Sequence, residues 1–178
     1  MQTLEQQMAF YAAYHQDPRN KATHFVGVPM IIFGLFIALG WARLELAGVP
    51  LTAAMLLAAV VLAWYFLLDV PLALAMLAVN AVLLYLADLV SRQPPSQGMV
   101  WFLVFFAGGW VIQLIGHAWE GRKPALVDNF FQIFVAPIFL AAEAFFALGY
   151  KPALHAAVQK RALQMRATAG IRDRAATA

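Results

Sequence analysis

Residues 51–90, LTAAMLLAAVVLAWYFLLDVPLALAMLAVNAVLLYLADLV, form the longest apolar region of the chain, interrupted only by Asp69 and, near its end, by Asp88. Forty residues make about 60 Å of helix, which is twice the thickness of a bilayer's hydrocarbon core. The region therefore predicts a hairpin of two membrane helices. Its natural corner is Asp69-Val70-Pro71, because Asp69 can cap a new helix and Pro71 fits the first turn of that helix. A buried ligand role for Asp69 is the alternative.

Two further apolar runs are long enough to cross a bilayer, since about 20 residues span the hydrocarbon core. One covers 25–41, or reaches as far as Leu46, and the other covers 99–116. The loop at 91–98 is marked by its Pro and Gly content. Together with the hairpin, these runs predict four transmembrane helices.

The segment 130–150 is apolar but interrupted by Pro137 and an acidic residue. If it were a fifth span, the basic tail at 151–178 would lie across the membrane from the basic residues at 19–21 and 122–123. The positive-inside rule disfavours that arrangement. We therefore expect a broken, re-entrant or interfacial segment, with both termini and the 118–129 loop on the cytoplasmic side.

The composition fits an all-α, multi-pass membrane helical bundle. Of 178 residues, 63% are hydrophobic and 12% are charged, whereas soluble domains are about 45–50% apolar and about 25% charged. Residues 1–150 are expected to form one membrane-embedded catalytic domain, beginning with an amphipathic helix at 4–16 that lies against the membrane surface. Residues 151–178 are expected to form a basic, partly helical cytoplasmic tail.

The charge distribution indicates which partners to expect. The formal net charge is +3, and six of the twelve Lys and Arg residues follow Tyr150. Anionic membrane lipid is therefore a better partner for the tail than nucleic acid, for which the chain carries no motif. The chain has no cysteine, so any metal must be held by nitrogen or oxygen ligands.

Polar chemistry gathers just before the first apolar run. Residues 14–24 read YHQDPRNKATH and contain three candidate site residues: His15, Asn20 and His24. Pro18 lacks an amide hydrogen and disfavours helix in the residue before it, so we expect one helix to stop here and another to begin near Thr23. A bend of that kind can point both imidazoles at one ion.

A second polar group lies at the end of the last predicted span. Gln113, His117 and Glu120 follow i, i+4, i+7 spacing and so share one face of a helix. Asp128 follows in a charged loop, and Gln132 lies inside the next apolar segment. Both histidine-bearing stretches are thereby expected on one side of the membrane.

Each of these histidines alone is explained by a hydrogen bond to a lipid headgroup or to a backbone carbonyl. Three of them on one side, with amides and carboxylates nearby, favour a shared metal site. Imidazole and carboxylate without thiolate suit iron, zinc or manganese. Glu120 is either a ligand itself or, like Asp128, an acceptor for the second N–H of a histidine ligand.

Three motifs carry a resemblance to a known family. They are His15-x4-Asn20-x3-His24-Phe-Val-Gly-Val-Pro29, Trp110-x2-Gln113-x2-Gly116-His117-x2-Glu120-Gly-x2-Pro124-Ala-Leu and Asn129-x2-Gln132-x4-Pro137-x5-Glu143. In combination they resemble the Mpo1-like family, over about residues 5–150.

The resemblance implies a membrane-bound, Fe(II)-dependent dioxygenase that converts a 2-hydroxy fatty acid into the acid one carbon shorter. It implies that His15, His24 and His117 are the iron ligands. The polar residues around them, Glu120, Asn20, Gln113, Asp128 and Gln132, are then expected to support catalysis. Dioxygen and a long-chain 2-hydroxy acid are the expected reactants, at a site near the cytoplasmic face of a bacterial inner membrane or of the endoplasmic reticulum.

Two other classes remain open. In a non-catalytic transporter or assembly protein, Asp69 and Glu143 would be central, because acids inside membranes commonly mark ion routes. A zinc-dependent lipid hydrolase would use the same histidines without dioxygen.

Overall fold

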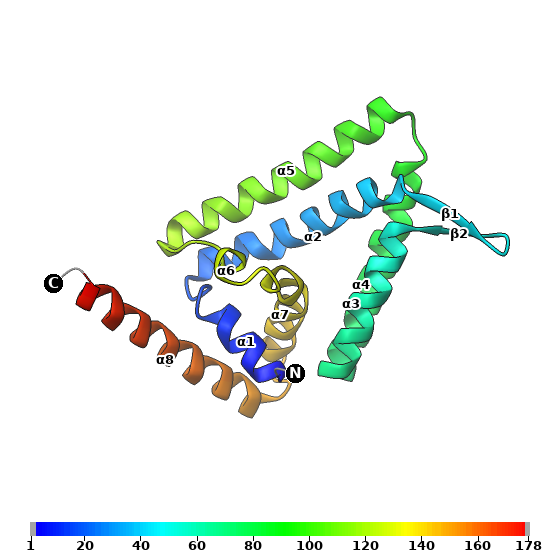
Figure 1. The fold of residues 1–178 in the computed structure, drawn as a ribbon. Coiled ribbons are helices and arrows are strands. Elements are labelled where there is room, and N and C mark those ends of the chain that lie inside the picture. Colours follow the sequence, from blue (N-terminus) through cyan, green and yellow to red (C-terminus); the bar gives the residue numbers. More distant parts are fainter. Residues whose placement is uncertain (1–2, 177–178) are drawn as a thin grey trace.

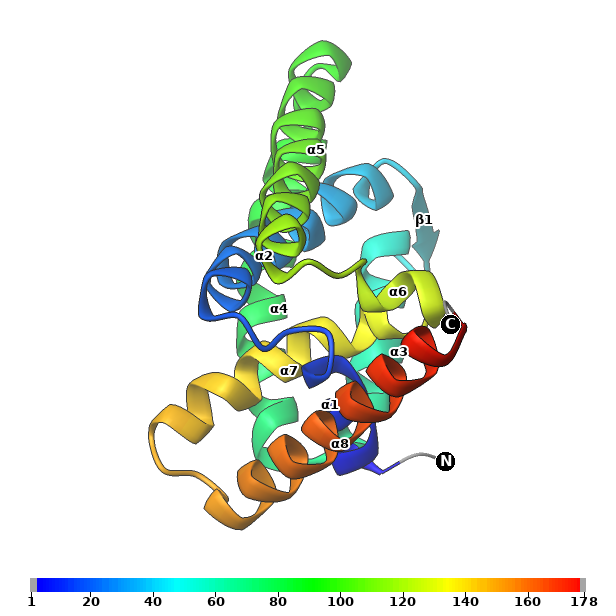
Figure 2. The same cartoon turned by 90° about the vertical axis from the view of Figure 1, so that its left-hand side faces the viewer.

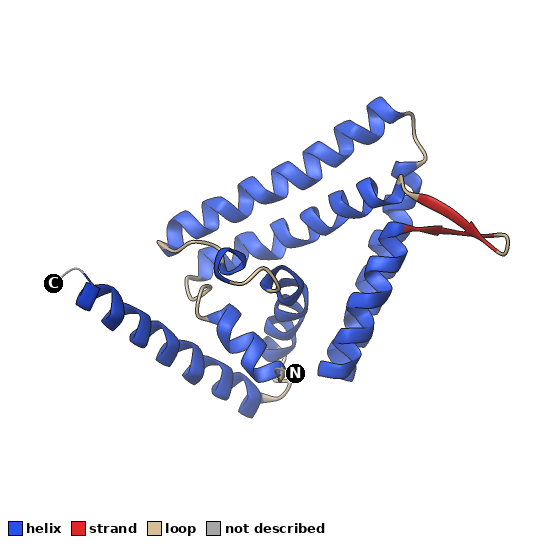
Figure 3. Cartoon of the chain, viewed as in Figure 1, coloured by secondary structure: helices blue, strands red, loops and turns tan. Residues whose placement is uncertain are grey.

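The structure is a computed structural model that describes residues 3–176, with side chains through Ala169. Helices dominate it, and one small hairpin is the only β structure in that range (Figure 3), in agreement with the expected helical membrane class. In chain order the elements are α1 (Leu4–Ala12), α2 (Pro18–Gly40), β1 (Arg43–Leu46), β2 (Val49–Thr52), α3 (Ala53–Leu68), α4 (Val70–Ser91), α5 (Pro95–Glu120), α6 (Ala125–Asp128), α7 (Gln132–Ala147) and α8 (Pro152–Ala176).

Two long helix pairs and a group of shorter helices build the fold (Figure 1). Helices α2 and α5 run antiparallel along one another, while α3 and α4 form a second pair that diverges from the first. Helices α1, α7 and α8 gather beside the N-terminal end of α2, where α1 contacts both of the others (Figure 2).

The predicted corner between α3 and α4 is confirmed. Asp69 is the N-cap of α4, and its carboxylate accepts a hydrogen bond from the backbone N–H of Leu72 at 3.2 Å. Pro71 lies in the first turn of the same helix, where its missing N–H leaves no hydrogen bond unmade. The cap and the proline together turn one long apolar stretch into a hairpin.

Three helices, α2, α4 and α5, are long and apolar enough to cross a membrane. Helices α3 and α7 are apolar but have 16 residues each. At 1.5 Å per residue, 16 residues extend about 24 Å, which is short of the roughly 30 Å hydrocarbon core. The first half of the expected hairpin is therefore shorter than a full span.

Helix α2 begins at Pro18, earlier than the expected start near Thr23. Asp17 caps it by accepting a hydrogen bond from the Arg19 N–H at 2.8 Å, and Pro18 occupies its first turn. The helix break at Pro18 is thus confirmed, but the restart is immediate because the proline itself opens the new helix. His24 consequently lies within α2, whereas His15 lies in the preceding loop.

Glycines let α2 and α5 approach closely. A Cβ atom added to Gly27 would lie 2.9 Å from the carbonyl oxygen of Gly109, and one added to Gly34 would lie 2.7 Å from the Phe106 nitrogen. Near the histidines, a Cβ on Gly116 would lie 2.0 Å from the Thr23 hydroxyl. Small residues of this kind allow backbone contact between membrane helices, which lack a hydrophobic force drawing them together.

The β-hairpin at 43–52 was not expected. Leu44, Leu46 and Val49 are exposed, and the tight turn has positive φ angles at Ala47 and Gly48, 52° and 78°. Positive φ at both central residues is the geometry that matches the twist of a two-residue hairpin loop. The span that was expected to reach Trp41 or Leu46 therefore ends at Gly40.

Helix α7 continues through Pro137, where we expected a break. Proline removes one hydrogen bond and disturbs the carbonyls of the preceding turn. One carbonyl of that turn, from Phe134, accepts a hydrogen bond from the hydroxyl of Tyr65 on α3. Support of this kind from a neighbouring helix is how membrane helices tolerate proline.

Helix α1 was expected to lie against the membrane surface, and in the structure its buried face packs against α7 and α8. Met8 and Ala12 are fully buried, and the helix ends at Ala12, before the expected limit at residue 16. Helix α8 covers it, with Val158 and Ala162 also fully buried. The basic segment after residue 150 is therefore packed against the N-terminal helix over the part whose side chains are described; residues 177–178 lie outside the described range.

Candidate metal centre

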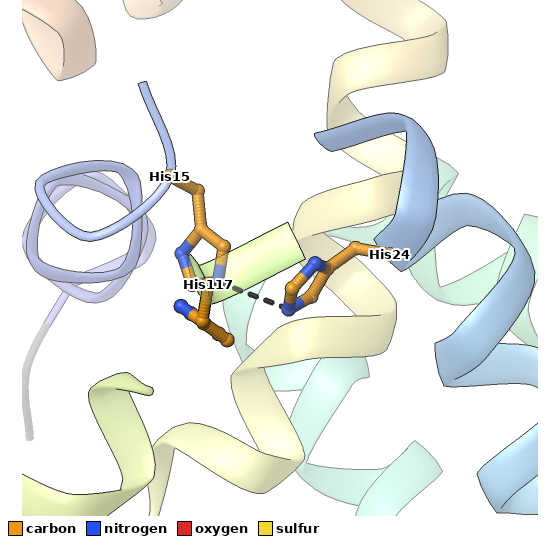
Figure 4. Close-up of side chains that lie close together, drawn as sticks. All are labelled: His15, His24 and His117. Atoms are coloured by element: carbon orange, nitrogen blue, oxygen red, sulfur yellow. Dashed lines mark hydrogen bonds between the residues drawn. The ribbon is translucent and has the colours of Figure 1, made fainter. Parts of the chain in front are cut away.

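Three histidines from distant parts of the sequence meet in one buried cluster (Figure 4). His15 comes from the loop between α1 and α2, His24 from the second turn of α2, and His117 from the last turn of α5. Their exposed fractions are 1%, 1% and 5%, and each offers a ring nitrogen within 4.8 Å of the others. The structure thus brings together all three residues that were predicted to bind metal.

Backbone carbonyls fix the orientation of two of these rings. The Nδ1 atom of His15 lies 2.7 Å from the carbonyl oxygen of Tyr11, and the Nδ1 atom of His24 lies 2.8 Å from that of Asn20. A carbonyl oxygen can only accept, so both rings carry their proton on Nδ1 and leave Nε2 with a free lone pair. This is the usual arrangement of a histidine metal ligand and its outer hydrogen bond.

The two Nε2 atoms of His15 and His24 face one another at 3.1 Å (Figure 4). Two lone pairs at that distance repel each other unless a cation lies beside them. Burial, and then the proximity of His24, lower the pKa of His15 well below its usual range, so its ring is neutral and an extra proton does not fill this role. Two nitrogens that are each about 2.1 Å from one ion lie about 3.0 Å apart at an octahedral angle and about 3.4 Å apart at a tetrahedral angle, so this separation suits a pair of metal ligands.

His117 adds a third donor to the same cluster. Its Nδ1 atom is buried and has no hydrogen-bond partner among the described residues. Buried polar atoms rarely stay unpaired in folded proteins, and an unpaired one calls for an explanation such as an ion. The donor set therefore fits a metal ion held by three imidazoles, with coordination positions left for other ligands.

The Glu120 carboxylate makes no hydrogen bond to any of the three histidines. One oxygen accepts hydrogen bonds from the backbone N–H groups of Gln16 and Asp17, at 3.0 and 2.6 Å, and the other is paired with the Arg166 guanidinium. The Glu120 side chain is 2% exposed. The expected role as an acceptor for a histidine N–H is not seen, because the carbonyls of Tyr11 and Asn20 take that place for His15 and His24. Glu120 instead fixes the loop that follows His15.

Asn20 joins this support on the other side of the cluster. It is fully buried, and its side-chain amide lies 3.4 Å from both the Glu120 carboxylate and the carbonyl of Tyr14. Its backbone carbonyl also holds His24. Asn20 therefore connects the His15 loop to the first turns of α2.

A cavity of about 310 Å³ opens beside the histidines and is lined almost wholly by apolar side chains. Gln113 and Gln132, both predicted site residues, lie in its wall. The Oε1 atom of Gln132 is buried and unpaired among the described residues, and its Nε2 atom lies 3.4 Å from Gln7. Two amides thus lie among the mostly apolar side chains that line this space.

Asp128 lies apart from the cluster. Its carboxylate accepts a hydrogen bond from the Tyr14 hydroxyl at 2.7 Å and pairs with Lys123 at 2.6 Å, near the protein surface. These contacts, the ion pair first, lower the pKa of Asp128. They hold α6 against the His15 loop from outside and do not extend into the cavity.

The acids that would mark a transport path are paired and do not line the cavity. Asp69 forms an ion pair with Lys151, and Glu143 pairs with Lys21 at 2.7 Å, joining α7 to α2. Sequence reasoning missed two other residues, one that supports the histidine loop and one in the cavity wall. Arg166 lay in the supposed tail, and Asn80, which lines the cavity from α4, was hidden in an apolar run without any spacing signal.

Comparison with known proteins agrees with this geometry. The family described as "2-hydroxy-palmitic acid dioxygenase Mpo1-like" matches residues 1–148. The 2-hydroxy-palmitic acid dioxygenase MPO1 of Saccharomyces cerevisiae is 34% identical over 160 residues, covering 88% of this chain and 87% of the yeast protein. No solved structure gives a significant match. The chain belongs to the Mpo1-like family.

Proposed function

We propose that the protein is a membrane-bound, iron-dependent dioxygenase that shortens 2-hydroxy long-chain fatty acids by one carbon. The observation that carries the proposal is a buried cluster of three histidines at one end of an apolar cavity. The similarity to a 2-hydroxy-palmitic acid dioxygenase supports the substrate class and the use of dioxygen.

His15, His24 and His117 would hold the metal through ring nitrogens. Zinc and iron both accept imidazole ligands, and the choice of Fe(II) follows from the dioxygenase chemistry. When bound, iron supplies a redox-active centre with positions open to dioxygen and to substrate oxygens. The chain's own contribution is to keep the imidazoles neutral, oriented and shielded from water.

The polar end of the cavity suits the head of a 2-hydroxy acid. The amides of Gln113 and Gln132 can donate to its carboxylate, and the unpaired Oε1 of Gln132 can accept from its hydroxyl. The reaction consumes one dioxygen per acid and needs no other oxidant or reductant. The C1–C2 bond breaks, C2 becomes the new carboxyl carbon, C1 leaves as carbon dioxide, and the four electrons removed from the two carbons reduce dioxygen, with one water formed.

We further propose that the histidine cluster lies near the cytoplasmic face of the membrane. Helices α2, α4 and α5 are long enough to span it. The basic residues at 19–21 and 122–123 flank the ends of α2 and α5 that carry the histidines. Basic residues beside spans are enriched on the cytoplasmic side.

The proposal is tested with the purified protein, Fe(II) and a labelled 2-hydroxy long-chain acid, with and without oxygen. An acid shortened by one carbon should appear only in the aerobic sample. His15→Ala, His24→Ala and His117→Ala should each lose both metal and turnover while remaining folded. His155→Ala is the matched control, because His155 stacks on Phe146 in α7, outside the cluster.

Equal turnover without oxygen would contradict a dioxygenase. Unchanged substrate in both samples would favour the hydrolase, transporter or assembly-protein alternatives. Full metal content in any folded variant would exclude that histidine as an essential ligand. Retention of metal by all three variants would contradict the proposed site.

A further inference from the structure

The cavity extends lengthwise along α2. The residues that α2 contributes to its wall include His24, Val28, Ile31, Leu35 and Phe36, which form one face of the helix. From His24 to Phe36 is twelve residues, or about 18 Å at 1.5 Å per residue. One leaflet of a bilayer's hydrocarbon core is about 15 Å thick, so the cavity has the length of a single acyl chain.

Three helices line the end of the cavity that lies farthest from the histidines along α2. Phe36 of α2 and Ala58 of α3 belong to one buried cluster there, and both line the cavity. Asn80 of α4 lies at the same level, because Ala58 and Asn80 are each eleven residues from the corner at Asp69 in an antiparallel hairpin. The exposed fractions of Phe36 and Ala58 are both 4%, so neighbouring residues hold both side chains in place.

Asn80 is the polar group at this end. Its Nδ2 atom donates to the carbonyl oxygen of Met76 at 2.8 Å, one turn earlier in α4. Its Oδ1 atom accepts no hydrogen bond from any residue within the described range. An acyl chain extending over this oxygen would strip it of water without pairing it, which is unfavourable. A polar side chain in a membrane helix is by default a functional candidate.

We propose that Phe36, Ala58 and Asn80 form the end wall of an acyl-chain subsite and set the longest fatty acid that the protein accepts. Phe36 and Ala58 limit the length by volume. Asn80 limits it by the cost of covering an unpaired polar oxygen with hydrocarbon. The inference rests on the proposed function, since it places the acid head at the histidines, but it concerns binding and can be tested without turnover.

The test measures how tightly the protein, in lipid nanodiscs, binds saturated fatty acids of about 12 to 20 carbons, lengths that bracket the ~18 Å cavity. These acids lack the 2-hydroxyl group, so binding is read separately from reaction. Ala58→Leu adds three carbons to the end wall and should move the preference to shorter chains. Affinity for the longest acids should fall about fourfold for each methylene that no longer fits.

Phe36→Leu and Asn80→Leu should move the preference in the opposite direction, toward longer chains, because they remove volume or the polar oxygen. Ala59→Leu is the matched control: it makes the same change one residue along α3, on an exposed position, and should leave the profile unchanged. The product lengths from 2-hydroxy acids should shift in parallel with the binding profiles.

The outcomes separate the two proposals. If the binding profiles shift as expected but no shortened acid forms, the end wall stands and the proposed reaction fails. If Ala58→Leu and Ala59→Leu give the same profile, or if Phe36→Leu and Asn80→Leu both leave the preferred length unchanged, the end wall is wrong whatever the activity. Ala58→Leu should shorten the preferred acyl chain, whereas Phe36→Leu and Asn80→Leu should lengthen it, so the test remains decisive if one of these variants does not fold.

Discussion

His24 and His117 are positioned by close helix packing, whereas His15 is positioned by hydrogen bonds to a loop. The first two lie on α2 and α5, whose backbones touch at glycines along their length. His15 lies in the loop between α1 and α2, which is held by the buried carboxylate of Glu120. One histidine cluster is thus assembled by two different kinds of interaction, helix packing and hydrogen bonding.

The difference indicates how each half of the site should respond to change. Closely packed backbones leave no free space between them, so one added methyl group forces the helices apart. A loop held by hydrogen bonds can lose one contact and keep the others, because Glu120 receives several. Substitutions in the helix contact should therefore remove the site, and substitutions in the loop contact should weaken it in steps.

The largest effect is expected for Gly116→Ala. The new Cβ would lie 2.0 Å from the Thr23 hydroxyl and 2.5 Å from the Asn20 side-chain oxygen, so α5 must move away from α2. We expect complete loss of metal and a fall in unfolding free energy of about 1–3 kcal/mol, the usual cost of overpacking. Thermal unfolding and metal analysis of the purified protein measure both effects.

Gly108→Ala provides the control on the same helix, because the nearest atom to its added Cβ is the flexible end of Met30 at 3.4 Å. It should keep its metal. If Gly116→Ala binds metal as well as Gly108→Ala does, close packing is not what positions the two helical histidines.

The helix corner and the approximate positions of the three histidines could be predicted from the sequence, because the residues that determine them are neighbours in the chain. The corner at Asp69 followed from a cap and a proline, and the histidine positions followed from Pro18 and from the spacing of His117 within its helix. The sequence did not reveal how the glycines pair, since Gly116 faces Thr23 only once the two helices are docked. Backbone approach is a property of the pair of helices and not of either one.

The role of Arg166 could not be predicted for a similar reason. A basic, alanine-rich segment reads as a solvated tail until α1 presents a surface for it to cover. Arg166 was not predicted to support the site, whereas Asp128 was predicted to belong to the site and does not. Contacts with Lys123 and Tyr14 hold the Asp128 side chain outside the cavity. The Arg166–Glu120 ion pair and the Tyr14–Asp128 hydrogen bond each join residues that are distant in the sequence, and spacing along the chain does not reveal such contacts.

A smaller effect than that of Gly116→Ala is expected for Glu120→Gln, which keeps the shape of the side chain and removes its charge. The backbone N–H groups of Gln16 and Asp17 then lose a charged acceptor, which is the stronger kind. We expect metal affinity to fall about 10–100-fold, as is typical for residues that orient ligands. Competition with a chelator measures this, and a folded variant with unchanged affinity would remove Glu120 from the support of the site.

Arg166→Ala should have a weaker effect than Glu120→Gln. The Arg166 side chain is 29% exposed, so water partly replaces it, while the backbone contacts of Glu120 remain. We expect about fivefold weaker metal binding, equivalent to about 1 kcal/mol. Arg161→Ala is the control, because its 3.6 Å contact with Glu5 is exposed on both sides and should contribute nothing measurable.

If Arg166→Ala and Arg161→Ala lower metal affinity equally, α8 acts through its overall charge and not through Glu120. If Arg166→Ala matches Glu120→Gln, the carboxylate works only when the guanidinium is in place. Either outcome would contradict the expectation that substitutions around the His15 loop weaken metal binding in separate steps.

The smallest effect is expected for Asp128→Asn, the predicted site residue that the structure leaves outside the cavity. Metal content and turnover should be unchanged, and stability should change by no more than about 0.5 kcal/mol, as at most surface positions. The lowered pKa of Asp128, caused first by Lys123 and then by Tyr14, gives the sign of the pH dependence. A carboxylate of this kind contributes stability above its ordinary pKa of about 3.9 and loses it as the pH falls through the lower folded value.

The small advantage of the native protein over Asp128→Asn should therefore be present at neutral pH and disappear in acid, as measured by urea unfolding across that range. Loss of turnover with full metal content would instead make Asp128 a catalytic residue and would require α6 to move toward the histidines. Loss of metal would mean that the Tyr14–Asp128 hydrogen bond positions His15 as strongly as Glu120 does. In that case the position of the His15 loop would depend on two carboxylates, the buried one of Glu120 and the one of Asp128 at the surface.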